Sequence, residues 1–142
     1  MRRKQTRSEA RIEAFKLVFQ LECNGDDVEF LIQQMLLHRP KSIDNIAYIR
    51  KVVCGVQEKN EELEADIRAG ITSARRLERI SRVALAALKV AVFEIKYVED
   101  VPPKVAINEA VEIDKQFDDP DNSAFVNGVL GGFCRNANIS GE

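Results

Sequence analysis

Five cationic side chains near the N-terminus are the first residues in this sequence whose type and spacing suit the binding of an anionic ligand. Arg2, Arg3 and Lys4 precede Arg7 and Arg11, and the last two are four residues apart and share one face of a helix. Guanidinium groups bind phosphate oxygens in pairs, so the cluster suits the backbone of a nucleic acid. On composition alone, a basic terminus that only keeps the chain in solution is the commoner explanation.

A phenylalanine near the C-terminus is the second candidate. The last helical pattern has its apolar face at Val126, Val129, Leu130 and Phe133, and Phe125 is rotated by about 100° from Val126. Phe125 therefore lies at the border of the core. There it can stack on an unpaired base or pack under the preceding turn, and the sequence leaves both open.

Clustered carboxylates precede that helix. Asp118, Asp119 and Asp121 surround Pro120, with Glu112 and Asp114 nearby, and such groups can bind a hard cation or transfer protons. The central glycine and final glutamate of a calcium loop are missing. A solvated acidic turn at a helix N-terminus is the favoured interpretation.

The cysteines, the histidine and the known short motifs indicate neither an enzyme nor a metal centre. The three cysteines, Cys23, Cys54 and Cys134, are widely spaced and odd in number, as is typical of free thiols in a reducing cytoplasm. His38 is the only histidine and has no serine or cysteine at a spacing that suggests a triad. No phosphate-binding or zinc-binding motif occurs. We expect no catalytic residue, no metal and no cofactor.

The size and charge of the chain set the class of protein. Its 142 residues, 45% of them hydrophobic, are enough for one compact domain. The formal net charge of -2 gives no general affinity for anions, so an anionic partner is expected only near the N-terminus. No apolar run reaches about 18 residues and no secretory signal begins the chain, so we expect no membrane segment.

Helical periodicity extends over nearly the whole chain. Thr6 and Glu9 predict a capping box, and Asn24-Gly25 predicts the end of the first helix. Ser42 or Asp44 begins a further helix. The charged residues 57–68 either continue that helix or begin a new one, which ends at Gly70. The predicted segments are 6–24, 28–36, 42–70, 77–98, 103–117 and 123–135. We therefore predict an all-α compact bundle of about six or seven helices, a single domain over 1–142 with packed halves 6–70 and 74–136.

The segment 77–98 is the most apolar and is predicted to be the buried centre, with Leu88 and Ile95 inside. Its polar residues Arg82, Lys89 and Lys96 recur every seven residues and form one narrow stripe. In the last helix, Gly128, Gly131 and Gly132 lower helix propensity, so they predict the close approach of a neighbouring helix.

Two motifs in the C-terminal half carry a resemblance to a known family. DVPPKVAINEAVE at 100–112 and FVNGVL at 125–130 closely resemble the pattern of the NusB family of bacterial transcription antitermination factors. LKVAVFE at 88–94 and the N-terminal Arg7, Ala10, Arg11 and Ala14 are also similar to that family. The resemblance covers nearly the whole chain.

The resemblance implies a cytoplasmic, all-helical RNA-binding protein without catalysis. It implies binding to single-stranded boxA-type RNA together with NusE, a small-subunit ribosomal protein. It also implies association with RNA polymerase and other Nus factors during read-through of terminators in ribosomal RNA operons. Arg7 and Arg11 would contact phosphate and Phe125 a base, while Asp121 would moderate RNA affinity. The sequence is also compatible with a homodimer.

Three positions depart from the family pattern. Ser8 replaces its second arginine, for which Arg2, Arg3 and Lys4 compensate in part. Ala84-Leu85 stands where the family usually has Asp-Arg, which marks Ala84 as the altered position of a NusE-binding surface. Gly131 replaces an aspartate. These departures leave a second hypothesis open, a helical protein–protein adaptor that keeps the fold without strong boxA binding.

Overall fold

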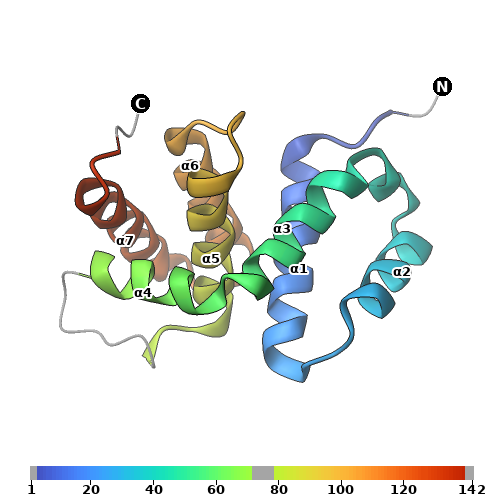
Figure 1. The fold of residues 1–142 in the computed structure, drawn as a ribbon, viewed down its shortest axis with the longest axis horizontal. Helices are drawn as coiled ribbons and strands as arrows, with labels where there is room; N and C mark the ends of the chain where they lie inside the picture. The colour runs from blue at the N-terminus through green and yellow to red at the C-terminus, as the bar shows by residue number, and fades with distance from the viewer. Residues whose placement is uncertain (1–2, 72–78, 140–142) are drawn as a thin grey trace. The chain divides into compact units, whose positions relative to one another are not determined.

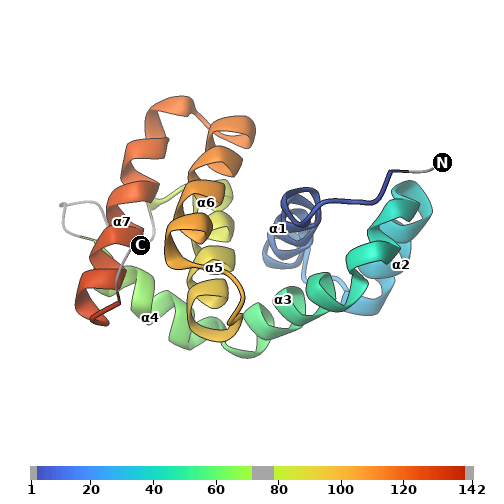
Figure 2. The same cartoon turned by 90° about the horizontal axis from the view of Figure 1, so that it is seen from above.

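The computed structural model describes residues 3–71 and 79–139, and these residues form helices joined by short turns (Figure 1). Figure 2 shows the same helices from above. Within the described ranges no strand occurs, which confirms the predicted all-α class. The elements are α1 (Arg7–Asn24), α2 (Val28–His38), η1 (Pro40–Asn45), α3 (Ile46–Glu58), α4 (Asn60–Gly70), α5 (Arg82–Tyr97), α6 (Pro103–Phe117), η3 (Pro120–Asn122) and α7 (Ser123–Asn136).

Local sequence signals set both ends of α1. The Glu9 backbone N–H donates to Thr6 Oγ1 at 3.0 Å, and the Thr6 N–H donates to Glu9 Oε1 at 2.8 Å, which confirms the capping box. Gly25 follows the helix with φ of 68°, a left-handed conformation that glycine adopts without strain, and its N–H donates to Leu21 O.

The predicted helix start at Ser42 or Asp44 is wrong. Both residues lie inside η1, a 3-10 helix that begins at Pro40 and leads directly into α3. Residues 57 and 58 still belong to α3, and the rest of the charged stretch forms a new helix, α4, because the chain turns at Lys59.

The chain forms two compact units, Met1–Glu58 and Lys59–Glu142. The expected division near Gly70 therefore falls one helix earlier. The physical reason is that α4 packs against α5 and α7 and contributes Leu63 and Ile67 to the second unit.

In the first unit α1 packs against α3, and α2 with η1 packs beside them. The buried apolar side chains come from all three α-helices; they include Ala14, Leu17, Val18, Ile32, Met35, Ile49, Val52 and Val53. In the second unit α5 packs against α4, α6 and α7 and has more buried residues than any of those three helices. Leu88 is fully buried, as predicted, whereas Ile95 near the end of α5 is only half-buried.

The polar stripe on α5 faces a helix. Lys89 is 1% exposed, and its Nζ lies 2.6 Å from Asn60 Oδ1 and 3.0 Å from Glu64 Oε2. One heptad later, Lys96 Nζ lies 2.5 Å from Glu62 Oε2 and 2.7 Å from Asp66 Oδ2. The stripe at Lys89 and Lys96 is thus an inter-helix ion-pair ladder between α4 and α5.

Two glycines let α4 and α7 cross at backbone distance. A Cβ added to Gly132 would lie 2.5 Å from Gly70 O, and a Cβ added to Gly70 would lie 2.5 Å from Val129 O. Asn136 Nδ2 also donates to Ala69 O at 2.8 Å. The predicted close approach of a neighbouring helix is therefore confirmed at Gly132, whereas a Cβ on Gly128 would meet nothing within 4 Å.

Candidate nucleic-acid interface

Gln5 attaches the N-terminal arm to η1. The Gln5 backbone N–H donates to Asp44 Oδ2 at 3.0 Å, and its side-chain Nε2 donates to Ser42 Oγ at 3.0 Å. Asn45 Nδ2 donates to Gln5 O at 3.1 Å and to Gln5 Oε1 at 3.0 Å. We call Gln5, Ser42, Asp44 and Asn45 the Gln5 clamp. It gives residues 3–6 a defined path, although the sequence suggests only a solvated arm.

Arg3 and Lys4 are exposed on this arm, and Arg2 lies outside the described residues. The Arg3 guanidinium donates to both carboxylate oxygens of Glu9, at 3.1 and 2.9 Å. The hydrogen bond from Arg3, with that from the Thr6 N–H, lowers the pKa of Glu9 to about 2. Glu9 is therefore ionised at neutral pH and offsets the charge of Arg3, whereas Lys4 makes no such ion pair with the described residues.

Arg7 and Arg11 both lie against the ring of Tyr48, which α3 supplies. The Arg7 Cζ is 4.3 Å from the ring centroid and the Arg11 Cζ is 5.9 Å from it, so both guanidinium groups are within cation–π range. Arg7 is half-buried, whereas Arg11 is only 2% exposed. The expected shared cationic face is thus corrected: Arg7 reaches the surface and Arg11 lies beneath it, because the face they share is the one that α1 packs against α3.

Phe125 and Asp121 belong to the second unit. Phe125 is half-buried in the first turn of α7, next to the fully buried Val126, as its position at the border of the core predicts. Asp121 is exposed in η3, and its backbone N–H donates to Asp119 Oδ1 at 3.0 Å. An exposed carboxylate therefore lies four residues before a partly accessible aromatic ring.

Ala84 is not a surface residue. Its methyl group is 1% exposed, and its backbone N–H donates to the Oγ of Ser81, the N-cap of α5. The expectation that Ala84 marks a partner-binding surface is therefore corrected, because an aspartate at this position would have to bury its carboxylate in the second unit. Arg82 is the exposed residue of this turn.

The acidic cluster contains one buried carboxyl group. Asp114 is 0% exposed, and neither of its carboxyl oxygens has a hydrogen-bond partner among the described residues. Burial, with the nearby carboxylates of Asp118 and Asp119, raises the pKa of Asp114 to about 7. Asp118 accepts hydrogen bonds from Ser81 Oγ at 2.5 Å and Asn122 Nδ2 at 3.4 Å. Burial alone would raise the pKa of Asp118, but these hydrogen bonds outweigh it and lower that pKa.

Two residues of the interface are missed by sequence reasoning, Tyr48 and Gln5. Tyr48 reads as one more apolar residue of α3, and its contact with Arg7 joins helices 41 residues apart in the chain. Gln5 precedes a capping box and resembles any polar linker residue. Its role depends on acceptors in η1 that the sequence does not place.

No helix of the described part of the chain is long and apolar enough to cross a membrane. In that same part, no group of three or more histidine, cysteine or acidic side chains is arranged to hold a metal ion.

Comparison with known proteins identifies the family. The NusB family profile matches residues 8–135. The transcription antitermination protein NusB of Lactiplantibacillus plantarum is 40% identical over 134 residues, which cover 92% of this chain and 96% of that protein. A solved structure of NusB from T. maritima is 27% identical, covers 94% of this chain and 93% of its own, and superposes with a TM-score of 0.78.

A third comparison supports the fold alone. In a crystal structure of the antitermination factors NusB and NusE with double-stranded RNA, the matching chain is 24% identical, with a TM-score of 0.81. That match covers 92% of this chain and 96% of the other. The chain described above belongs to the NusB family.

Proposed function

We propose that this protein is a transcription antitermination factor that binds single-stranded boxA-type RNA together with NusE and acts in the cytoplasm without catalysis. In this role it joins RNA polymerase and other Nus factors and promotes read-through of terminators in ribosomal RNA operons. The names of its relatives, which are transcription antitermination proteins, support this role.

The observation that carries the proposal is the placement of Arg7 on Tyr48 beside the clamped arm. A guanidinium held against a ring loses little conformational entropy when it binds a phosphate oxygen. Charge distribution agrees: residues 1–58 contain ten Lys or Arg against eight Asp or Glu, whereas residues 59–142 contain eleven against fifteen. RNA phosphates are therefore attracted to the first unit.

Each candidate residue has a distinct role in this proposal. Arg7 and Lys4 neutralise phosphates, Arg2 and Arg3 add charge on the arm, and Arg11 supports Tyr48 from beneath. Phe125 stacks on a base, and the charge of Asp121 repels phosphates and so moderates affinity.

Salt dependence tests the phosphate contacts. For single strands, log affinity falls with log salt with a slope of about -0.7 per phosphate neutralised. Lys4→Ala combined with Arg7→Ala is expected to flatten this slope by about 1.4 and to weaken boxA-type and scrambled RNA alike. Phe125→Ala is expected to leave the slope unchanged and to cost about 1–3 kcal/mol, the usual contribution of base stacking. Fluorescence anisotropy over several salt concentrations, with and without NusE, measures both quantities.

The matched control is Lys104→Ala, which removes an exposed lysine of α6 outside the interface. It is expected to leave the salt slope as in the wild type. If the Lys4→Ala, Arg7→Ala variant keeps the wild-type affinity and slope, the N-terminal charge does not bind RNA and the adaptor hypothesis replaces the proposal.

Tyr48 is expected to position Arg7. Tyr48→Leu removes the ring and should weaken RNA binding roughly three- to ten-fold, because a cation–π contact contributes about 0.5–2 kcal/mol. Tyr48→Phe keeps the ring and should restore most of the affinity. Thermal melts of both variants show whether a loss of RNA affinity comes from a loss of stability. If Tyr48→Leu melts at the wild-type temperature and binds RNA as tightly as the wild type, Tyr48 does not position Arg7.

A further inference from the structure

Nothing in the fold requires a glycine at position 128. Glycine is the poorest helix former after proline, yet Gly128 lies inside α7, in its second turn. Its backbone conformation does not need glycine, because Gly25 is the only glycine with a positive φ among the described residues. Its neighbours do not need it either, since a Cβ added at Gly128 would meet nothing within 4 Å. Gly132 of the same helix, by contrast, is required by the crossing with α4.

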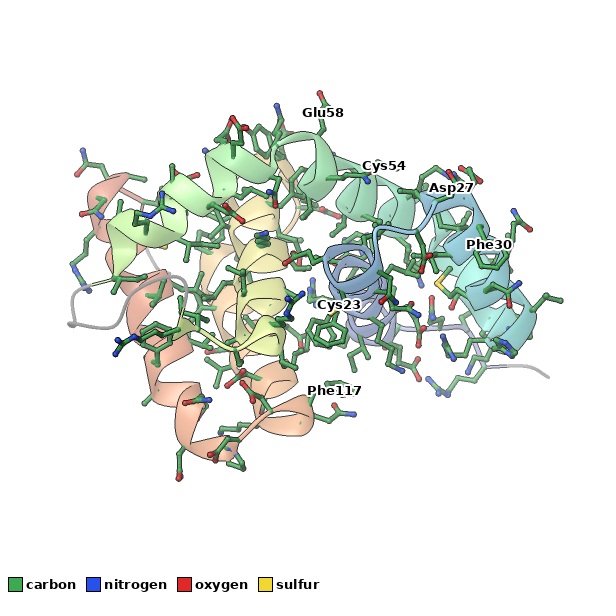
Figure 3. All side chains as sticks on the ribbon, turned by 90° about the horizontal axis from the view of Figure 1, so that it is seen from below. Cys23, Asp27, Phe30, Cys54, Glu58 and Phe117 are labelled. Carbon is green, nitrogen blue, oxygen red and sulfur yellow. The ribbon has the colours of Figure 1, made fainter. Side chains whose placement is uncertain are left out.

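Gly128 lies one helical turn beyond the phenylalanine that the proposed function assigns to an RNA base. In Figure 3 the labelled Phe117 marks the end of α6, from which the chain runs through η3 into α7. Phe125 is half-buried in the first turn of α7, and the exposed Gly128 follows it at i+3. Ala124, which is exposed and precedes Gly128 by four residues, has only a methyl group. The accessible part of Phe125 is therefore bordered on α7 by two residues with almost no side chain.

Helix geometry determines what a side chain at position 128 would cover. Each Cα–Cβ bond of an α-helix tilts toward the N-terminus, so a side chain covers the turn that precedes its own Cα. A side chain at position 128 would therefore extend over Ala124 and toward the Phe125 ring. Glycine leaves that space open, at the expense of helix propensity.

We propose that Gly128 is part of the base-binding site, where it keeps one face of the Phe125 ring open and lets an unpaired base lie against the backbone of α7. This inference rests on the proposed function, in which Phe125 stacks on a base. Stacked aromatic rings are offset, with centroids about 4.5–7 Å apart, so a base on Phe125 extends past the edge of that ring and over the next turn of the helix. A residue without a side chain leaves room for it there.

A series of increasing side-chain size at position 128 tests the proposal. Gly128→Leu is expected to raise the melting temperature, through helix propensity and an i, i+3 contact with Phe125. The same variant should weaken the binding of boxA-type RNA by about five- to 150-fold, as much as Phe125→Ala, because leucine occupies the stacking space. Gly128→Ala should also raise the melting temperature and should weaken RNA binding by a smaller factor. Circular dichroism measures the stability and fluorescence anisotropy the affinity, and a purely structural glycine would not change them in opposite directions.

Gly131→Ala and Gly131→Leu are the matched controls in the same helix. Gly131 is half-buried, and a Cβ there would meet only the end of the flexible Arg135 side chain, at 3.4 Å. Six residues separate Gly131 from Phe125, which places the two on different sides of α7. Both control variants should therefore bind RNA as the wild type does, and circular dichroism establishes that they are folded.

A double-mutant cycle distinguishes this inference from the proposed function. If leucine acts by covering the ring, Gly128→Leu should weaken RNA binding by less than about two-fold once Phe125→Ala has removed that ring. Wild-type affinity of Phe125→Ala itself would contradict the base contact of the proposed function, and this inference with it. If Phe125→Ala weakens RNA binding whereas Gly128→Leu binds RNA as tightly as the wild type, the role of Gly128 alone is overturned.

Discussion

Replacing Gly132 by alanine is expected to destabilise the second unit by roughly 2–3 kcal/mol, although alanine is the better helix former by about 1 kcal/mol. The reason is the crossing of α4 and α7, where a new Cβ would lie 2.5 Å from Gly70 O. That oxygen belongs to the backbone, so the clash is relieved only if a whole helix moves. Gly70→Ala should act in the same direction, since its Cβ would meet Val129 O at 2.5 Å.

Gly128→Ala is the matched control in the same helix. A Cβ at Gly128 meets nothing within 4 Å, so this substitution should stabilise α7 by about 1 kcal/mol through helix propensity alone. Melting temperatures followed by circular dichroism should therefore change in opposite directions for Gly132→Ala and Gly128→Ala. A Gly132→Ala variant that melts at or above the wild-type temperature would show that α4 and α7 do not cross this closely.

Asp114→Asn is expected to stabilise the protein at pH 8 and to have almost no effect at pH 3. The carboxyl of Asp114 is fully buried without a hydrogen-bond partner among the described residues, and burial raises its pKa from 3.8 to about 7. Below pH 3.8 the group is neutral in the folded and unfolded chains, so it carries no penalty. Between about pH 4 and 7 the unfolded chain releases this proton while the folded chain retains it, so stability falls as pH rises.

The loss levels off as pH rises beyond 7, and its size is then on the order of 4 kcal/mol, because each tenfold difference in proton affinity between the folded and unfolded chains contributes about 1.4 kcal/mol. The asparagine variant has no proton to lose and should lack this part of the pH dependence. Urea unfolding of both proteins at intervals between pH 3 and 8 measures it. The result would be contradicted if the stabilities of the two proteins ran parallel over that range. Asp121→Asn, which changes an exposed carboxylate of the adjacent η3, provides the control and should show no comparable difference.

Features governed by neighbouring residues could be predicted from the sequence. The capping box of Thr6 and Glu9 and the left-handed Gly25 depend on contacts within four residues, and both match the structure. The apolar spacing of α5 likewise predicts the burial of Leu88. Such features follow from local backbone chemistry, which the sequence contains directly.

Features that depend on which helices pack against one another could not be predicted from the sequence. Arg11 and Lys89 have charges that suggest solvent, yet each is almost fully buried because another helix supplies a ring or a carboxylate. Ala84 is also buried against expectation. The resemblance to the family suggests that it lies on a contact surface, whereas the helix start at Ser81 directs its side chain inward. The division of the chain at Glu58 rather than Gly70 also depends on which neighbours α4 packs against. These choices are made by tertiary packing, which periodicity does not encode.

The ladder between α4 and α5 has one further consequence, for how α4 docks. Lys89 and Lys96 are seven residues apart, and each lies between two acceptors that are four residues apart on α4. Sliding α4 along its axis by one turn, about 5.4 Å, leaves Lys89 with only one of its two acceptors, because Asn60 and Glu64 are about one turn apart, and Lys89 has almost no access to water to replace the other. A buried ammonium that loses a partner is costly, whereas apolar contacts of leucine and isoleucine survive a small slide. The two lysines therefore fix the position of α4 along its axis. Hydrophobic packing holds α4 on the core, and the charged contacts favour one alignment of α4 against α5.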